Sequence, residues 1–592
     1  MLETRAGLIQ VALGRIQPEL LVHNIRLVNV YSGELLEGQA VAVWRGRIAY
    51  VGPEARAGEN TEVIDGEGMY LLPGLIDVHG HADIIVNPLV LAREILPTGT
   101  TAMLTDTHDI AGALGTTGFE RMLEATRSIP FHYYFAAPAT CPPLSEFEGQ
   151  EMFSPALVEQ FMAQPRVLAV SEVTAWGRLT VPDTDKELLA KLVSAKAGGK
   201  RIEGHMAGCS YDKLNALTAG GFSSCHESIT AEEALHRLRL GLYVALRHGS
   251  IRADLELLSR LITENPGLDT SRVMLTPDWF SPQDLLQHGY MNYLVSYAVE
   301  LGISPLKAIQ MVTINPATYL GLDQEIGGIA PGRLADMLLV PDISKPLPQR
   351  VWVGGQTVAR DGKLWVGIPP FPRTMLADWR PGRVPNRPVK AGDFVLEIEA
   401  TDRVQVPCIH MVNKTITQER TLDLPVVDGH LEISGHPEVM KISLWSETEQ
   451  AWTTGLLSGL GARIGGYASS IAHETHMPMV VGASDEEMAL AANRMLEMGG
   501  GAVIVDGGRI IGEVPLTIGG ILSSSGLRET AEAWTRLNTY LRDKGCPWDD
   551  PLFGLGFLSF TGLPYVRITP SGIVDIRKQK VIFFNRRRGA LS

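Results

Sequence analysis

The chain has 592 residues, which at roughly 150 residues per domain suggests about four domain-sized units and excludes a single small binding module. Hydrophobic residues make up 45% of the sequence and charged residues 20%, as in an ordinary globular protein rather than a disordered or fibrous one. The formal net charge is −14 at pH 7. A field of that sign repels polyphosphate and anionic membranes, so nucleic acid and membranes are not expected partners.

The cysteines and the N-terminal residues indicate a reducing compartment. The 5 cysteines are scattered and form no C-x-x-C pair, which argues against a disulfide framework and against a thiolate zinc site. No uninterrupted apolar stretch that could act as a signal peptide follows Met1, and no apolar run reaches the ~18 residues of a membrane span. We therefore expect a cytoplasmic protein, with the basic run at 586–588 as a solvated tail.

Short strands are predicted at the start of the chain. Residues 21–72 hold apolar runs that are separated by turn signals, at the spacing of ~8 to 12 residues that is typical of a small β-sandwich or partial barrel. Strand-like runs return at 335–340 and 350–355. We therefore expect residues 1–72 and 321–370 to form one split β-sandwich domain.

Between these two parts the pattern changes to one of alternating strands and helices. Predicted strands at 101–105 and 167–170 alternate with predicted helices at 118–127 and 185–197. Such alternation, carried over about 240 residues, indicates parallel βα units that close into a (β/α)8 barrel. We place this barrel at 73–320.

The end of the chain is expected to form a further domain. Prolines crowd the stretch 367–390 too densely for any regular element, and we place a linker at 371–390. Residues 391–592 then look like an independent α/β domain, with a helix predicted at 485–496 and a strand at 501–505. The predicted fold class is α/β: a (β/α)8 barrel with a split β-sandwich and a C-terminal α/β domain.

The first chemical signal is the pair His79 and His81. Side chains at positions i and i+2 of a strand share a face, so both imidazoles can meet one metal ion. An isolated H-x-H also occurs as an ordinary surface pair. The apolar strand that precedes it and the lead-in from Pro73 to Asp77 favour the metal site.

Further imidazoles and carboxylates follow the ends of later predicted strands, where (β/α)8 enzymes carry their catalytic groups. They are Glu172, His205, His226, Glu227 and Asp278. Ordinary core packing does not account for so many polar groups in this one position. Mixed imidazole and carboxylate ligands suit divalent transition metals, and a carboxylate can bridge two ions.

These motifs resemble the metal-dependent amidohydrolase superfamily and, within it, the adenine deaminases, over nearly the whole chain. The resemblance rests on the lead-in Pro73 to His81 and on the stretches 105–111, 202–205, 226–234 and 470–476. It implies a centre with two divalent metal ions, manganese or iron, with zinc as the alternative. The ligands that it implies are His79 and His81 on one ion, Glu172 as the bridge, His205 and His226 on the second ion, and Asp278.

The reaction that the resemblance implies is hydrolytic deamination of adenine to hypoxanthine and ammonia. A hydroxide bound to the metal would attack C6, Asp278 would take its proton and pass it to the leaving amine, and Glu227 would protonate a ring nitrogen. His108 is a further catalytic candidate. Asp83 and Asp106, together with Glu227, are candidate contacts to the substrate. We expect a small-molecule substrate and a homo-oligomer, a dimer.

The chain departs from the family pattern around the expected pocket. Residues 82–85 read Ala-Asp-Ile-Ile where relatives tend to carry Ile-Glu-Ser-Ser, and residues 276–279 hold one aspartate where relatives usually carry two. An amidohydrolase that acts on another aminated purine-like heterocycle or on a cyclic amide is therefore the alternative enzyme hypothesis. A non-catalytic binding protein is the alternative from a different class, and it would predict lost metal ligands.

Two other groups receive structural interpretations. His473 and His476 lie at i and i+3, and we favour capping or packing over a second metal site. Arg247 and His248 end a strand-like run, and an ordinary loop pair is favoured over contact with the substrate.

Overall fold

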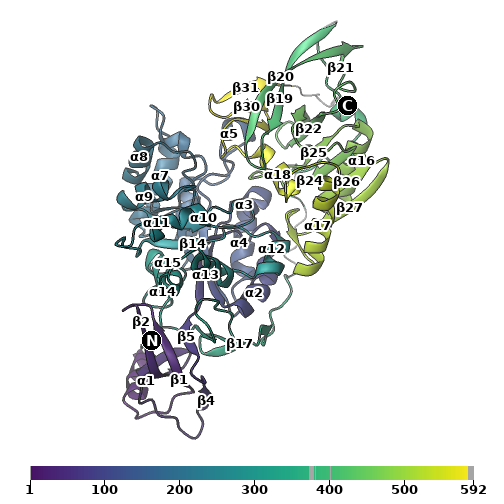
Figure 1. Cartoon of the computed structure of the whole chain (residues 1–592). Helices are drawn as coiled ribbons and strands as arrows, with labels where there is room; N and C mark the ends of the chain where they lie inside the picture. Colours follow the sequence, from purple (N-terminus) through teal and green to yellow (C-terminus); the bar gives the residue numbers. More distant parts are fainter. Residues whose placement is uncertain (1, 373–378, 380–381, 400–401, 585–592) are drawn as a thin grey trace.

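The computed structural model describes residues 2–372, 379, 382–399 and 402–584. A β domain lies at the N-terminal end, a barrel follows in the middle, and a C-terminal domain lies beyond the barrel (Figure 1). Residues 373–378 and 380–381 of the predicted linker, and the basic run at 586–588, lie outside the described residues. Within the described part, no helix combines the length and the apolar character needed to cross a membrane.

One continuous sheet forms the N-terminal β domain. It follows helix α1 (Leu2–Ala12) and runs in the order β18 (Lys363–Leu364), β17 (Gln356–Arg360), β16 (Arg350–Val353), β15 (Met337–Val340), β5 (Tyr70–Pro73), β1 (Leu20–Asn29), β2 (Glu34–Trp44) and β3 (Arg47–Gly52), with β4 (Glu62–Asp65) beside β1. The sheet folds over on itself, because Val41 and Ile48 share one core with Trp352 from the far arm. Strand β5 joins the two parts, since it pairs parallel to β1 and antiparallel to β15.

The predicted (β/α)8 barrel is confirmed. Its strands are β6 (Leu75–Gly80), β8 (Thr100–Thr105), β9 (His132–Ala137), β10 (Val167–Val170), β11 (Arg201–Ile202), β12 (Ser224–Cys225), β13 (Tyr243–Arg247) and β14 (Val273–Thr276). They form two parallel sheets, β11-β10-β9-β8-β6 and β12-β13-β14. A parallel bridge from Gly80 to Asp278 closes one seam, and the Ser223 N–H, donated to the Ile202 carbonyl at 2.9 Å, closes the other.

Helices surround the barrel strands. They are α2 (Pro88–Ile95), α3 (His108–Leu114), α4 (Thr116–Ala125), α5 (Ser145–Glu148), α6 (Pro155–Met162), α7 (Lys186–Ala197), α8 (Tyr211–Ala219), α9 (Ala231–Arg239), α10 (Leu255–Leu258), α11 (Arg260–Thr263), α12 (Pro282–His288), α13 (Met291–Glu300), α14 (Pro305–Gln310) and α15 (Ile314–Leu320). The predicted strand 167–170 has these bounds in the structure. The predicted helix 185–197 begins one residue later, because Asp185 is its N-cap and accepts the Leu188 N–H.

The C-terminal domain is built on a second large sheet. Its order is β21 (His430–Leu431), β20 (Thr417–Val427), β19 (Arg403–Met411), β23 (Ala451–Ser458), β22 (Val439–Ser446), β25 (Met479–Gly482), β24 (Gly466–Ser469), β26 (Gly501–Asp506) and β27 (Arg509–Pro515). The predicted helix 485–496 is confirmed as α16 (Asp485–Glu497), which packs on β24 and β26. The remaining elements are α17 (Leu527–Asp543), α18 (Pro551–Gly556) and the small sheet β29 (Val566–Thr569), β30 (Gly572–Asp575) and β31 (Lys580–Phe583).

The C-terminal domain is joined to the barrel rather than independent of it. Strand β28 (Leu522–Ser523) pairs parallel with β7 (Ile85–Val86), a strand just after the H-x-H pair. Helix α17 lies against α12 of the barrel, and the rings of Trp279 and Phe553 stack at 4.2 Å across the boundary. Because β7 follows β6 and Trp279 follows β14, these contacts place the C-terminal domain at the carboxyl ends of the barrel strands.

Candidate functional site

The six predicted metal ligands converge at the carboxyl ends of the barrel strands. Each is at most 9% exposed. They come from β6 and from the residues that follow β6, β10, β11, β12 and β14, in the order His79, His81, Glu172, His205, His226 and Asp278. Because parallel strands end on one face of the barrel, residues far apart in the sequence meet there.

Asp278 faces both histidines of the H-x-H pair. Its Oδ1 lies 3.6 Å from His79 Nε2 and 3.2 Å from His81 Nε2. The His79 ring stacks on His226 with the centroids 4.0 Å apart, which brings a third imidazole to the same place. Asp278 has a φ of 66°, in the left-handed region that few residues other than glycine adopt, so its side chain is aimed at some cost in backbone strain.

Glu172 lies between two groups of imidazoles. Its Oε2 is 2.6 Å from His205 Nδ1 and 3.3 Å from His226 Nε2. Its Oε1 is 3.5 Å from His81 Nε2. One carboxylate oxygen thus faces each group, which is the arrangement that a bridging ligand between two ions requires.

The donor set fits divalent metal ions. Atoms that bind one ion at ~2.1 Å lie roughly 3 to 3.5 Å apart, and most of the distances given above are of this size. His79 Nε2 and His205 Nε2 are buried without a hydrogen-bond partner among the described residues. Unpaired buried nitrogens are costly, so an ion would satisfy what the protein itself leaves open.

Charge also favours cations at this centre. Burial alone would lower the pKa of His79, yet Asp278 and Glu203 hold that pKa well above its ordinary value. Burial would raise the pKa of Glu172, but the neighbouring His205 and His226 hold it well below the ordinary value. Buried carboxylates here need positive charge beside them, and divalent ions would supply it without protons on the imidazoles.

Glu203 is a buried residue that the sequence analysis did not single out. Its Oε2 lies 3.3 Å from His79 Nδ1, while its Oε1 accepts hydrogen bonds from Ser224 Oγ at 3.0 Å and from the Tyr319 hydroxyl. A carboxylate behind a metal-binding imidazole fixes the ring and leaves the other nitrogen free for the ion. Its position in the sequence, two residues before His205 and on the same inward face, could have identified it as a site residue.

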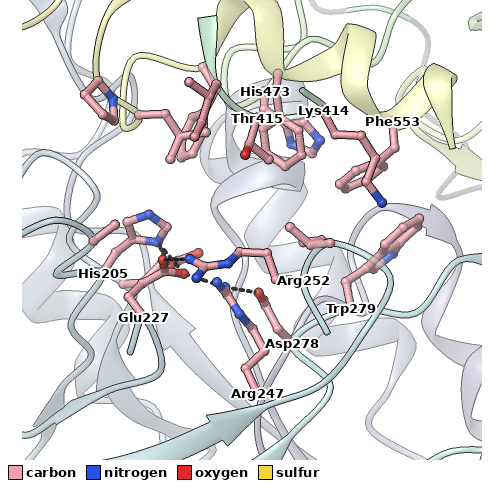
Figure 2. A pocket seen from close by; sticks show the side chains of 18 of the residues that line it. His205, Glu227, Arg247, Arg252, Asp278, Trp279, Lys414, Thr415, His473 and Phe553 are labelled. Carbon is pink, nitrogen blue, oxygen red and sulfur yellow. Dashed lines mark hydrogen bonds and ion pairs between the residues drawn. The ribbon is translucent and has the colours of Figure 1, made fainter. Parts of the chain in front are cut away.

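The expectation that Arg247 belongs to an ordinary loop pair is wrong. Arg247 is the last residue of β13 and is 2% exposed, because its side chain turns into the barrel mouth. Its Nη1 donates to Asp278 Oδ2 at 2.7 Å and also to Glu227, as Figure 2 shows. His248 lies apart from them, 3.3 Å from the hydroxyl of Tyr293.

Glu227 is held by two guanidinium groups. Besides its bond to Arg247, it accepts a hydrogen bond from Arg252 Nη1 at 3.0 Å. Burial would raise the pKa of Glu227, but Arg247, followed by His205, lowers it to about 2. Glu227 is therefore a carboxylate at neutral pH, and it must gain a proton before it can give one away.

The other predicted site residues, Asp83, Asp106 and His108, lie beside this cluster. Asp106 Oδ2 accepts the backbone N–H of Glu172 at 2.8 Å, and Asp83 Oδ2 accepts that of Ile110 at 3.0 Å. Neither aspartate is among the described residues that line the cavity, so their contact with the substrate stays a prediction. His108 lines the cavity, 3.6 Å from Glu172 Oε1, and its catalytic role also stays a prediction.

Asp109 is a second site residue without a role in the sequence analysis. Its Oδ1 accepts hydrogen bonds from His473 Nδ1 at 3.0 Å and from His476 Nε2 at 2.6 Å. Its Oδ2 lies 3.6 Å from His81 Nδ1. The two C-terminal histidines lie in a turn rather than on one face of a helix, and that turn reaches across to the barrel.

A cavity of about 560 Å³ lies between the barrel and the C-terminal domain. We call its barrel side the floor, formed by His81, Glu172, His205, Glu227, Arg247 and Asp278. Its opposite side is the roof, formed by Lys414, Thr415, His473, Phe553, Phe557 and Phe560. Figure 2 shows the two sides facing each other across the open space. Polar groups on the floor and aromatic rings on the roof suit a small, flat, polar substrate.

Known proteins resemble the chain in both parts. The amidohydrolase family matches residues 70–358, and the adenine deaminase C-terminal domain matches residues 414–580. An adenine deaminase of Cenarchaeum symbiosum is 35% identical over 97% of this chain and 93% of its own. An adenine deaminase of Moorella thermoacetica is 35% identical over 98% of both chains. An adenine deaminase of Clostridium botulinum is 32% identical over 97% of this chain and 96% of its own.

These matches confirm that the chain is a hydrolase that acts on carbon–nitrogen bonds and that the sequence resemblance was correct. The matched regions include the residues of the floor and those of the roof, so both sides of the cavity belong to parts of the chain that match this family. The chain belongs to the adenine deaminase family of the metal-dependent amidohydrolases.

Proposed function

We propose that this protein deaminates adenine by hydrolysis, giving hypoxanthine and ammonia. The observation that carries the proposal is the convergence of the six buried ligands beneath a cavity, in a chain whose relatives match it over nearly their whole length. A non-catalytic relative would be expected to have lost part of this predicted ligand set, and this chain carries a histidine or a carboxylate at all six positions.

The metal centre is proposed to hold two divalent ions, manganese or iron, with zinc as the alternative. His79, His81 and Asp278 would hold one ion, His205 and His226 the other, and Glu172 would bridge them. When bound, the ions lower the pKa of a coordinated water toward neutrality and so supply hydroxide. Glu203 holds the ring of His79 in place from behind.

Two carboxylates move the protons of the reaction. One water adds its oxygen to C6, the bond from C6 to the amino nitrogen breaks, and both protons of that water must be relocated. Asp278 takes one proton and delivers it to the leaving amine, which departs as ammonia. Glu227 begins as a carboxylate, takes the second proton, and gives it to the adjacent ring nitrogen, which bears it in hypoxanthine.

Arg247 prepares both carboxylates for these proton transfers. It donates to Asp278 Oδ2 and to Glu227, so both begin the reaction ionised and fixed in direction. Asp278 Oδ1 is left to face the imidazoles, while Arg252 binds the second oxygen of Glu227. A fixed guanidinium costs no reorganisation during the reaction, which is the general advantage of such preorganised charge.

Ammonia release from adenine tests the function. Protein loaded with manganese or iron should convert adenine to hypoxanthine, and Asp278→Asn should lose about 100-fold or more of that turnover while keeping its circular dichroism spectrum. Glu264→Gln, which changes an exposed carboxylate, is the matched control. No turnover by the metal-loaded wild type at high enzyme concentration would overturn the adenine proposal.

One observation supports a second candidate substrate. Ile84 lines the cavity at a position where family members tend to carry serine, so another aminated purine-like heterocycle is the alternative. A panel of 6-aminopurines and cyclic amides assayed beside adenine separates the two.

The cytoplasmic location, the dimer and the absence of nucleic acid partners remain predictions from composition and family.

A further inference from the structure

His473 is the one imidazole that the C-terminal domain brings to the cavity among the described residues. It lies in the turn between β24 and β25 and lines the same space as His81, Glu227 and Asp278. The proposed reaction gives it no task. The residue is 5% exposed, so it is a buried group rather than a surface histidine.

The hydrogen bonds of His473 define its tautomer. Asp109 Oδ1 lies 3.0 Å from His473 Nδ1, and a carboxylate can only accept, so this nitrogen carries the proton. In the neutral ring Nε2 then holds a lone pair and acts as an acceptor. Nε2 has no hydrogen-bond partner among the described residues. A buried acceptor without a partner is costly unless a ligand supplies the donor.

Packing holds the His473 ring in place. The His473 ring stacks on Phe557 with the centroids 4.8 Å apart and the planes at 21°, and Phe553 meets it edge-on at 5.0 Å. His476 donates to the same Asp109 oxygen at 2.6 Å and so holds the carboxylate as well. Asp109 Oδ2 lies 3.6 Å from His81 Nδ1. The Asp109 carboxylate therefore lies between the imidazoles of His473 and His81, and the fold sets the distance between these two rings.

We propose that His473 is a specificity-determining residue whose Nε2 accepts the N–H of the five-membered ring of a free purine base. The assignment rests on the proposed function, which puts the amino-bearing carbon of the six-membered ring on the floor. In the five-membered ring N7 lies beside C6 and N9 lies farther away, so with C6 on the floor it is the N9–H that points toward the roof. A purine substituted at N9 has no N–H in that ring and would leave Nε2 unpaired.

The aromatic surroundings make this bond selective. Phe553 and Phe557 pack against the His473 ring and Phe560 lines the same roof, and none of these three side chains can donate a hydrogen bond to Nε2. Sites built to hydrogen-bond a donor reject the analogue that lacks it far more strongly than apolar pockets reject a change of size. The roof would thus select the unsubstituted base.

Two substitutions separate recognition from structural support. In His473→Asn the amide nitrogen takes the place of Nδ1 and keeps the bond to Asp109, but no acceptor remains at the Nε2 position. In His473→Gln an amide oxygen can reach the Nε2 position, while the bond to Asp109 is lost. His410→Asn is the matched control, because His410 belongs to the same domain and bonds Ser458 at 3.0 Å outside the cavity.

The experiment compares adenine with 9-methyladenine for metal-loaded wild type and the three variants. We expect the wild type to prefer adenine and His473→Asn to lose about 10- to 100-fold in kcat/KM for adenine, mainly through KM, with little change for 9-methyladenine. His473→Gln should recover part of the preference, and His410→Asn should keep all of it. Calorimetric binding of both bases measures the preference without turnover.

Three results would overturn the assignment: a wild type that treats both bases alike, an His473→Asn variant that weakens both equally, or loss of a bound metal ion in that variant. The last would show that Asp109, His473 and His476 hold an ion instead. Retained binding preference without deamination would overturn the proposed function and support the assignment of His473. Turnover of adenine without any preference over 9-methyladenine would support the proposed function and overturn the assignment of His473.

Discussion

The floor and the roof face each other across one cavity but are built in opposite ways. The floor consists of buried imidazoles and charged groups at the ends of barrel strands, held by one another at hydrogen-bond or ion-pair distances. The roof consists mainly of aromatic rings from α18 and nearby segments of the C-terminal domain, which pack on Trp279 and on each other. The floor is therefore equipped for chemistry and the roof for recognition.

This contrast predicts two classes of variant. Changes on the floor should act on kcat, on metal binding and on the pH profile, because charge there is used during the reaction. Changes on the roof should act on KM and on the choice of substrate, because contacts there are made equally in the bound substrate and in the transition state. Roof variants that alter only kcat would contradict this division between the floor and the roof.

Metal removal should have the largest effect. Dialysis against a chelator should abolish turnover and lower the thermal midpoint, since the buried carboxylates of the floor would lose the cations that balance them. Metal content, activity and the melting curve are measured on the same sample, and re-addition of manganese or iron should restore the last two. Full activity at less than about one ion per chain would contradict a metal-dependent floor.

Loss of Arg247 should come next. Arg247→Gln removes the cation that holds the pKa of Glu227 at about 2, and burial then raises that pKa. Glu227 must be ionised to accept a proton, so activity lost on acidification should be lost at higher pH in the variant than in the wild type. We expect kcat to fall about 100- to 1000-fold at neutral pH.

The pH–rate profile of kcat/KM checks this expectation. Arg247→Lys keeps a positive charge and should shift the acid limb less than Arg247→Gln does. An unmoved acid limb in Arg247→Gln would show that Glu227 does not need to be ionised at the start of the reaction. That result would reassign the two carboxylates without affecting the metal centre.

Most residues of the floor could be predicted from the sequence, but few of those of the roof. His81, Glu172 and Asp278 could be predicted because each follows a strand-like run, and the fold places such positions on one face. Arg247 was missed because the side chain of a strand's last residue points inward or outward according to where the pairing with neighbouring strands stops. Its role emerges only from its bonds to Glu227 and Asp278.

The contact between Asp109 and His473 lay beyond sequence reasoning for a different reason. The two residues are 364 positions apart and meet only because one domain docks on the other. Their local sequence carries no periodicity that predicts docking, and the C-terminal region was expected to be independent for the same reason. Helices and strands within each domain were predictable, since they follow from local apolar patterns and caps such as Asp185.

Substitution of Glu203 should have a smaller effect, and it tests how the residue behind His79 supports the predicted metal site. Glu203→Gln keeps the shape of the side chain but weakens its hold on His79 Nδ1, 3.3 Å away. Substitutions of this kind cost about 10- to 100-fold in metal affinity or activity. Metal titration and kcat should change together, while Glu264→Gln should change neither. A Glu203 variant with normal metal affinity and normal kcat would show that the His79 ring is fixed by packing alone.

Phe553 should give the smallest effect, and it separates the roof from the floor most directly. Its ring stacks on Trp279 at 4.2 Å and meets His473 at 5.0 Å, so Phe553→Leu loosens the roof without touching a charged group. We expect KM for adenine to rise about two- to fivefold, the worth of one aromatic contact, with kcat and metal content unchanged. Phe583→Leu, a change in β31, provides the control. If Phe553→Leu instead lowered kcat at constant KM, packing of the roof would have to set the geometry of the floor, and the division between recognition and chemistry would fail.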